Sequence, residues 1–210
     1  MTDARRFLVK ICGVTSPADA EAAIAAGADA IGVNLWPGSK RFVADDRARE
    51  VLAAVPRGVL KVGVFVNASP EEVAAKLGAL GLDRAQLHGD EQARAFETID
   101  GGKLVRAVRV RDEATFASEQ PWEPGLWLYD AFVEGFGGGG VAAPWPLIAR
   151  RAARPFLLAG GLTPENVAAA IAHARPDGVD VASGVERTPG VKDPAKVAAF
   201  VDAARMAARL

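Results

Sequence analysis

Short runs of aliphatic and β-branched residues alternate along the chain with alanine-rich stretches in which apolar positions recur at helical spacing. This alternation is typical of strand and helix units that build a parallel sheet covered by helices. We identify eight such units, and no linker interrupts the series. The eight strands are expected to begin near Phe7, Asp29, Val59, Arg84, Lys103, Gly125, Pro155 and Gly178.

Three helix starts are marked by a hydroxyl residue directly before a proline, at Ser16-Pro17, Ser69-Pro70 and Thr163-Pro164. The hydroxyl can cap the first free amides and proline fits the first helical position, so each pair predicts a helix that begins at its proline. The unit at residues 112–120 is the weakest, because its helical stretch is short and runs into Pro121. A helix of only about two turns is expected there.

Eight consecutive units predict one closed (β/α)8 barrel domain over residues 1–210, although a doubly wound open sheet shows the same alternation. An open sheet would normally carry a glycine-rich phosphate turn after its first strand. Here Cys12-Gly13 occupies that place and the glycines cluster late in the chain, which favours the barrel. Barrel active sites lie at the carboxyl ends of the strands, so the candidates are sought there.

Composition narrows the classes of function. In this chain of 210 residues, 25 Lys and Arg residues nearly balance 26 Asp and Glu residues, so neither nucleic acid nor an anionic membrane is expected as a partner. One cysteine and two histidines leave too few ligands for a thiolate or histidine-rich metal site. No signal-peptide pattern and no run of about 18 apolar residues occurs. We expect a cytoplasmic protein, monomeric or homodimeric, that binds a small molecule without a metal.

Two residues capable of proton transfer stand at strand ends. Cys12 ends the first strand. A lone cysteine is most often a small buried hydrophobe, but the last barrel-facing position would direct the sulfur into the mouth of the barrel. Asp130 ends the sixth strand after four apolar residues, where a carboxylate is unexpected unless it caps a helix. Both are therefore candidate catalytic residues.

Two further residues are candidates for substrate binding. Arg41 ends the long loop after the second strand, and its planar guanidinium suits a carboxylate or a phosphate unless it is simply a surface residue. His88 ends the fourth strand, where it either touches the substrate or bonds to its neighbours. His173 lies at a helix end and is expected to be structural. The long loops 36–41 and 132–140 are expected to cover the substrate.

The loops that follow the last two strands are candidates for phosphate binding, because barrels often hold phosphate there through backbone N–H groups. Gly160, Gly161 and Gly184 would let the backbone approach an anion, unless they merely make tight turns, and Ser183 offers a hydroxyl. A short helix is expected around residues 186–188, with its positive end toward the anion. These features predict a phosphorylated substrate.

The sequence resembles that of the phosphoribosylanthranilate isomerases, a family of (β/α)8 enzymes of tryptophan biosynthesis, in a series of short segments and in their order along the chain. The resemblance runs from end to end, and among the segments that carry it are Lys10-Ile-Cys-Gly-Val-Thr15, Ser39-Lys-Arg41, Gln86-Leu-His-Gly-Asp90, Leu158-Ala-Gly-Gly-Leu-Thr-Pro-Glu-Asn166 and Gly178-Val-Asp-Val-Ala-Ser-Gly-Val-Glu186. It implies an Amadori rearrangement of N-(5-phosphoribosyl)anthranilate to 1-(2-carboxyphenylamino)-1-deoxyribulose 5-phosphate, without a cofactor. It further implies that Cys12 is the general base, that Asp130 is the general acid and that Arg41 holds the anthranilate carboxylate.

These roles require that the pKa of the thiol falls from about 8.5 and that the pKa of the carboxyl rises from about 3.9. The chain also departs from the family pattern, because Gly139, Pro144 and Ala182 replace a hydroxyl residue, an acid and a serine that are common there. The alternatives are another phosphosugar barrel enzyme, such as a ribulose-phosphate 3-epimerase, and an inactive barrel that acts as a binding protein. The epimerase would normally need more histidines around a metal.

Overall fold

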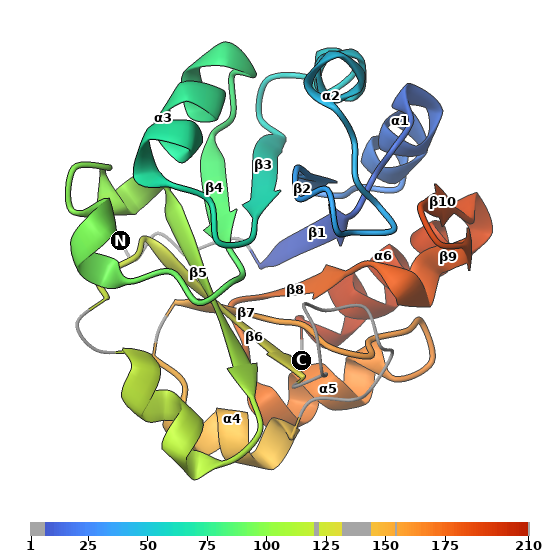
Figure 1. The fold of residues 1–210 in the computed structure, drawn as a ribbon. Helices are drawn as coiled ribbons and strands as arrows, with labels where there is room; N and C mark the ends of the chain where they lie inside the picture. The colour runs from blue at the N-terminus through green and yellow to red at the C-terminus, as the bar shows by residue number, and fades with distance from the viewer. Residues whose placement is uncertain (1–6, 120–121, 132–143, 154, 210) are drawn as a thin grey trace, which may run out of the picture.

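The structure is a computed structural model that describes residues 7–119, 122–131, 144–153 and 155–209. The chain folds as a closed barrel of eight parallel strands (Figure 1). The closed barrel predicted from the sequence is confirmed. Each strand begins at the expected residue or one residue later. The strands are β1 (Leu8–Cys12), β2 (Ala30–Asn34), β3 (Leu60–Phe65), β4 (Arg84–Leu87), β5 (Leu104–Val110), β6 (Leu126–Ala131), β7 (Phe156–Leu158) and β8 (Gly178–Val181).

The barrel closes where the first strand pairs with the last. Ile11 of β1 lies opposite Ile31 on one side and Val181 on the other, so β1 has a parallel partner along both edges. Helices surround the strands (Figure 1). The main apolar core packs between these helices and the strands. A smaller cluster of Val105, Ala107, Leu128, Leu157 and Ala159 forms a second apolar core on β5, β6 and β7.

Six α-helices are present in the described residues, and two of the three predicted starts are confirmed. The helices are α1 (Pro17–Ala25), α2 (Asp45–Ala53), α3 (Pro70–Ala79), α4 (Trp145–Arg151), α5 (Val167–Ala174) and α6 (Pro194–Ala207). The Oγ of Ser16 accepts from the amide of Asp19, and the Oγ of Ser69 accepts from the amide of Glu72. Both helices begin at the proline that follows the cap, as expected.

The third predicted start is wrong, because α5 begins at Val167 and not at Pro164. The side chain of Asn166 explains the delay. Its Oδ1 accepts from the amide of Thr163 and its Nδ2 donates to the carbonyl of Gly161, both at 2.8 Å. This residue therefore holds residues 161–166 as a turn, and the regular helix starts after it.

The fourth unit also departs from the expectation of one helix per strand. The connection from β4 to β5 contains only the short 3₁₀ helices η1 (Ala93–Phe96) and η2 (Gly101–Lys103). Its apolar residues Ala93, Phe96 and Ile99 are spaced by three, which aligns them in a 3₁₀ helix. The short helix predicted in the fifth unit is present as the 3₁₀ helix η3 (Glu113–Glu119).

The helix expected at residues 186–188 is not formed. That segment is the strand β9 (Glu186–Thr188), which pairs antiparallel with β10 (Val191–Lys192). Pro189-Gly190 forms the turn between them, with Gly190 at a φ of 85°, and this dipeptide is typical of a type II turn. The short helix after β8 lies earlier instead, as η4 (Ser183–Val185). None of the helices in the described ranges is long and apolar enough to cross a membrane.

Candidate active site

A cavity of about 410 Å³ opens at the carboxyl ends of the strands, and it brings together four of the predicted site residues. Cys12 from β1, His88 from the end of β4, Asp130 from β6 and Arg41 from the loop after β2 all line it. Asn34, Trp36, Gln86, Asp180 and Ala182 are among the other residues of its wall. The cavity therefore collects groups from strands on different sides of the barrel at the end where barrel active sites lie.

Cys12 is almost fully buried at this cavity, with 8% of its surface exposed. Gly32 lies opposite it on β2, and a Cβ at that glycine would stand 2.9 Å from the Cys12 Sγ, so the glycine leaves room for the thiol. Burial raises the pKa of Cys12, Lys10 lowers it by less and Asp180 adds to the rise, so the net shift is upward. The expected lowering of this pKa is wrong, because desolvation outweighs the nearby positive charge.

Asp130 and His88 lie close together in the wall of the cavity. The His88 Nε2 lies 3.3 Å from the Asp130 Oδ2, within ion-pair distance but without the alignment of a hydrogen bond. Among the described residues this nitrogen has no hydrogen-bond partner, although it is buried. On the other side of the carboxylate, a Cβ at Gly160 would stand 2.8 Å from the Asp130 Oδ1. The glycine therefore keeps the space beside the carboxylate open.

The interior network, as we call it, is a polar cluster of Lys10, Gln86 and Asp180 that the sequence analysis does not predict. Gln86 and Asp180 line the cavity, and Lys10 binds both of them. The Lys10 Nζ donates to the Gln86 Oε1 at 3.0 Å and to the Asp180 Oδ1 at 2.9 Å. Because β1 and β4 are not neighbours in the barrel, the first of these bonds crosses its interior. Burial alone would lower the pKa of Lys10, but Asp180 and Cys12 raise it above its usual value.

The signal that could have identified part of this network is the two-residue period of a strand. Lys10 stands two residues before Cys12, and Gln86 stands two residues before His88. Side chains two residues apart on a strand share a face. A charged or amide residue in an otherwise apolar strand, in step with a candidate catalytic residue, therefore indicates a polar barrel interior.

A second polar cluster, which we call the rim network, consists of the half-buried Arg41 and the buried residues Glu186 and Lys192. The Arg41 Nε and Nη2 donate to the two carboxylate oxygens of Glu186, each at 2.8 Å, and the Lys192 Nζ lies 2.9 Å from Oε1. Its bond to Glu186 raises the pKa of Arg41. Burial alone would raise the pKa of Glu186, but the two cations hold it below its usual range. Arg41 is thus a fixed residue of the cavity wall and not a free surface arginine.

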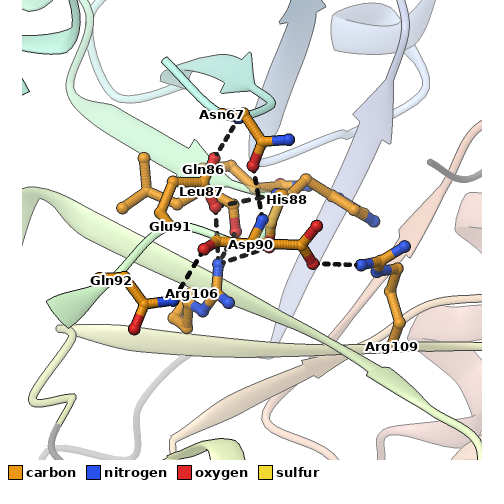
Figure 2. A network of polar contacts seen from close by, with 10 residues as sticks. Asn67, Gln86, Leu87, His88, Asp90, Glu91, Gln92, Arg106 and Arg109 are labelled. Carbon is orange, nitrogen blue, oxygen red and sulfur yellow. Dashed lines mark hydrogen bonds and ion pairs between the residues drawn. The ribbon is translucent and has the colours of Figure 1, made fainter. Parts of the chain in front are cut away.

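The loop after β4 that positions His88 is fixed by a buried carboxylate (Figure 2). Glu91 accepts from the amides of Asn67 and Gly89 at 2.8 and 2.9 Å and pairs with Arg106 at 2.8 Å. The same guanidinium nitrogen also donates to the carbonyl of Gly89 at 3.1 Å. These bonds tie the loop to the segment after β3 and to β5, so the backbone that carries His88 is held from both sides.

The structure brings the predicted phosphate residues together beside the cavity. Gly160 and Gly161 both have positive φ, at 88° and 62°. A Cβ at Gly184 would overlap the carbonyl oxygen of Leu162, so the loops after β7 and β8 are in direct contact. In the described part of the chain, neither these glycines nor Ser183 is among the residues that line the cavity of Cys12. The predicted loop at 132–140, with Gly139, lies outside the described residues.

Comparisons of sequence and of structure with known proteins point to the same family. The family model for N-(5'-phosphoribosyl)anthranilate isomerase matches residues 9–203. The protein of that name from Dechloromonas aromatica is 46% identical over 202 residues, which cover 95% of this chain and 96% of that protein.

Solved structures of the same family have the same fold. The phosphoribosyl anthranilate isomerase of Thermotoga maritima has a TM-score of 0.89 and 37% identity, over 95% of this chain and 98% of that one. A phosphoribosyl anthranilate isomerase in complex with reduced 1-(o-carboxyphenylamino)-1-deoxyribulose 5-phosphate has a TM-score of 0.84 and 36% identity, with the same coverage. The chain belongs to the family of N-(5'-phosphoribosyl)anthranilate isomerases.

Proposed function

We propose that the protein converts N-(5-phosphoribosyl)anthranilate to 1-(2-carboxyphenylamino)-1-deoxyribulose 5-phosphate, with Cys12 as the general base and Asp130 as the general acid. The observation that carries this proposal is that a thiol and a carboxyl, borne by β1 and β6, line one cavity at the carboxyl mouth of the barrel. Relatives that share nearly half of the sequence over the whole barrel support the choice of substrate.

The reaction needs one acid and one base. Asp130 delivers a proton to the ribose ring oxygen as the ring opens to a Schiff base, and Cys12 then removes the proton from C2′ to give an enolamine. The enolamine takes up a proton at C1′ from the Cys12 thiol and loses the proton of its 2′-hydroxyl to the Asp130 carboxylate, which gives the amino ketone and restores both groups. The rearrangement therefore requires no redox partner or cofactor. The Cys12 thiol must lose its proton before it can act as a base. Burial raises its pKa and opposes this loss, whereas the Lys10 charge favours the thiolate.

Arg41 is the proposed partner of the anthranilate carboxylate. Glu186 occupies its Nε and Nη2, so the guanidinium is held in one orientation at the cavity wall. We propose that Nη1 meets the carboxylate through a charge-assisted bond that a mobile side chain could not place as well. At the other end of the substrate, the amides of Gly161 and Gly184 and the hydroxyl of Ser183 are the proposed phosphate contacts, with Gly160 beside Asp130.

The experiment that tests this function is the loss of phosphoribosylanthranilate fluorescence after addition of purified protein. We expect first-order loss that scales with protein concentration and is abolished in the double variant Cys12→Ser, Asp130→Asn. Fluorescence that decays at the uncatalysed rate would contradict the proposal. The cytoplasmic location, the single domain and the monomeric or homodimeric state stay predictions.

A further inference from the structure

The two ring nitrogens of His88 have different surroundings. Nδ1 lies 2.9 Å from the Gln86 Nε2, next to it on the cavity wall, whereas Nε2 faces the Asp130 Oδ2 at 3.3 Å (Figure 2 shows Gln86 and His88). A neutral imidazole carries one hydrogen, on one nitrogen only. Which nitrogen carries it decides whether His88 donates to the cavity or accepts from it.

The orientation of the Gln86 amide follows from its other neighbour. The Lys10 Nζ lies 3.0 Å from the Gln86 Oε1. A lysine ammonium has three donors and no acceptor, so only the amide oxygen can face it. Asp180 holds the ammonium from its other side at 2.9 Å, and Lys10 has only 2% of its surface exposed. The amide NH₂ group is therefore left to face His88.

We propose that Gln86 is a positioning residue that holds His88 in the tautomer with its hydrogen on Nε2. The amide NH₂ donates to Nδ1, so Nδ1 must be the nitrogen with the lone pair, and Nε2 must be the one with the hydrogen. His88 is then a donor toward the cavity, where Asp130 and the substrate offer acceptors. The chain of contacts that imposes this runs from Asp180 through Lys10 and Gln86 to His88.

This tautomer has a consequence for Asp130 that rests on the function proposed above. With a donor beside Oδ2, the proton of a protonated Asp130 belongs on Oδ1, because two hydrogens cannot occupy the space between Nε2 and Oδ2. Gly160 leaves the space next to Oδ1 free of a side chain. His88 therefore selects which oxygen of the general acid carries the proton for the substrate.

The second histidine of the chain provides an internal reference. The His173 Nδ1 lies 2.7 Å from the carbonyl oxygen of Ala169, and a carbonyl only accepts. This contact favours a hydrogen on Nδ1 in His173, the reverse of His88. The two histidines should therefore show opposite patterns in one spectrum.

The test is ¹⁵N NMR of protein labelled at its histidines, recorded at alkaline pH, about two units above the ordinary histidine pKa of roughly 6.5. For His88 we expect a pyridine-like Nδ1 and a pyrrole-like Nε2. For His173 we expect mainly the reverse, and the His173→Gln variant assigns the signals. A pyrrole-like Nδ1 in His88 of the wild-type protein would overturn the proposal, whatever the variants do.

The variant Gln86→Glu tests the role of Gln86 itself. A carboxylate in that place accepts from Lys10 and also from a hydrogen on Nδ1, so the His88 signals should reverse and kcat should fall about tenfold or more, with a smaller change in KM. The matched control is Gln92→Glu, because Gln92 is exposed and, in the described part of the chain, its side chain donates to the carbonyl of Asp90. It should leave both spectrum and kcat unchanged.

Two results separate this inference from the proposed function. A folded Gln86→Glu protein with the wild-type His88 spectrum would overturn the role of Gln86. A wild-type protein with the expected tautomers but without turnover of phosphoribosylanthranilate would contradict the proposed function and leave the tautomer assignment standing.

Discussion

The two polar networks at the mouth of the barrel are built in different ways. The interior network of Lys10, Gln86 and Asp180 is carried by β1, β4 and β8, whose backbones are fixed by strand pairing on both edges. The rim network joins the loop that carries Arg41 to the β9–β10 hairpin through the ion pairs of Glu186. The first network adjoins the proposed proton-transfer groups, and the second holds the proposed binding group.

This difference indicates a division of labour. A proton-transfer group must be held within a few tenths of an ångström of its working position, and strands hold side chains more firmly than loops do. A binding group on a loop can be fixed by an ion pair instead. We therefore expect changes near the interior network to lower kcat and changes near the rim network to weaken binding.

The largest effect is expected from the proton-transfer pair. Cys12→Ser and Asp130→Asn should each lower kcat by at least about 100-fold, the usual contribution of a general acid or base, with less effect on KM. Steady-state kinetics on phosphoribosylanthranilate measure both constants. Asp202→Asn, on the exposed face of α6, is the matched control for the second variant. Near-normal turnover in either variant would remove that residue from the mechanism.

A smaller effect is expected at the rim. Arg41→Lys should weaken the binding of a reduced product analogue by roughly 10- to 100-fold, because lysine cannot pair with both oxygens of Glu186 and also meet a carboxylate. Isothermal titration calorimetry gives the dissociation constant. Arg49→Lys, whose exposed pair with Asp46 lies on α2, controls for the loss of a guanidinium. An unchanged dissociation constant would sink the assignment of Arg41.

The raised pKa of Cys12 predicts how the rate depends on pH. The base is the thiolate, so in the residual activity of the Asp130→Asn variant, where no carboxyl acid takes part, kcat/KM should rise about tenfold for each pH unit below the thiol pKa. Because burial raises that pKa, the rise should continue above the ordinary thiol pKa of about 8.5. A plateau that begins below about pH 8 would mean that Cys12 is not the base or that its thiolate is far better stabilised.

The smallest effect is expected at the phosphate. Ser183→Ala should raise KM by at most about tenfold, the contribution of one hydrogen bond to a charged group, because the backbone amides remain. Ser69→Ala provides the comparison. It removes the cap of α3 and should cost about 1 kcal/mol of stability without a change in KM. A much larger loss in the Ser183 variant would mean that this hydroxyl carries most of the phosphate binding.

The fold could be predicted closely because each strand is a short apolar run with clear ends. The type of helix in the connection from β4 to β5 could not be predicted, because the spacing of Ala93, Phe96 and Ile99 fits both an α-helix and a 3₁₀ helix. The delayed start of α5 depends on the Asn166 side chain, which binds the loop instead of leaving Thr163 to cap the helix. The first error comes from an ambiguous local pattern, and the second from side-chain contacts that outweigh the local pattern.

The candidate site was predicted in part. Cys12, Arg41, His88 and Asp130 were identifiable because they stand at strand ends or in a rim loop, and the structure places all four on one cavity. The pair of Arg41 with Glu186 joins residues 145 positions apart, which no local pattern reveals. The upward shift of the Cys12 pKa was missed for a similar reason, since its degree of burial depends on the closed barrel.

The most direct test is a crystal structure with a bound reduced product analogue. We predict that the Cys12 Sγ and the Asp130 carboxyl flank the ribulose carbons, that the carboxylate of the aromatic ring meets Arg41, and that the phosphate lies within hydrogen-bond reach of the amides of Gly161 and Gly184. A phosphate beside Lys40 or Arg41, with those amides empty, would contradict the proposed orientation of the substrate. An analogue bound away from Cys12 and Asp130 would contradict the proposed site itself.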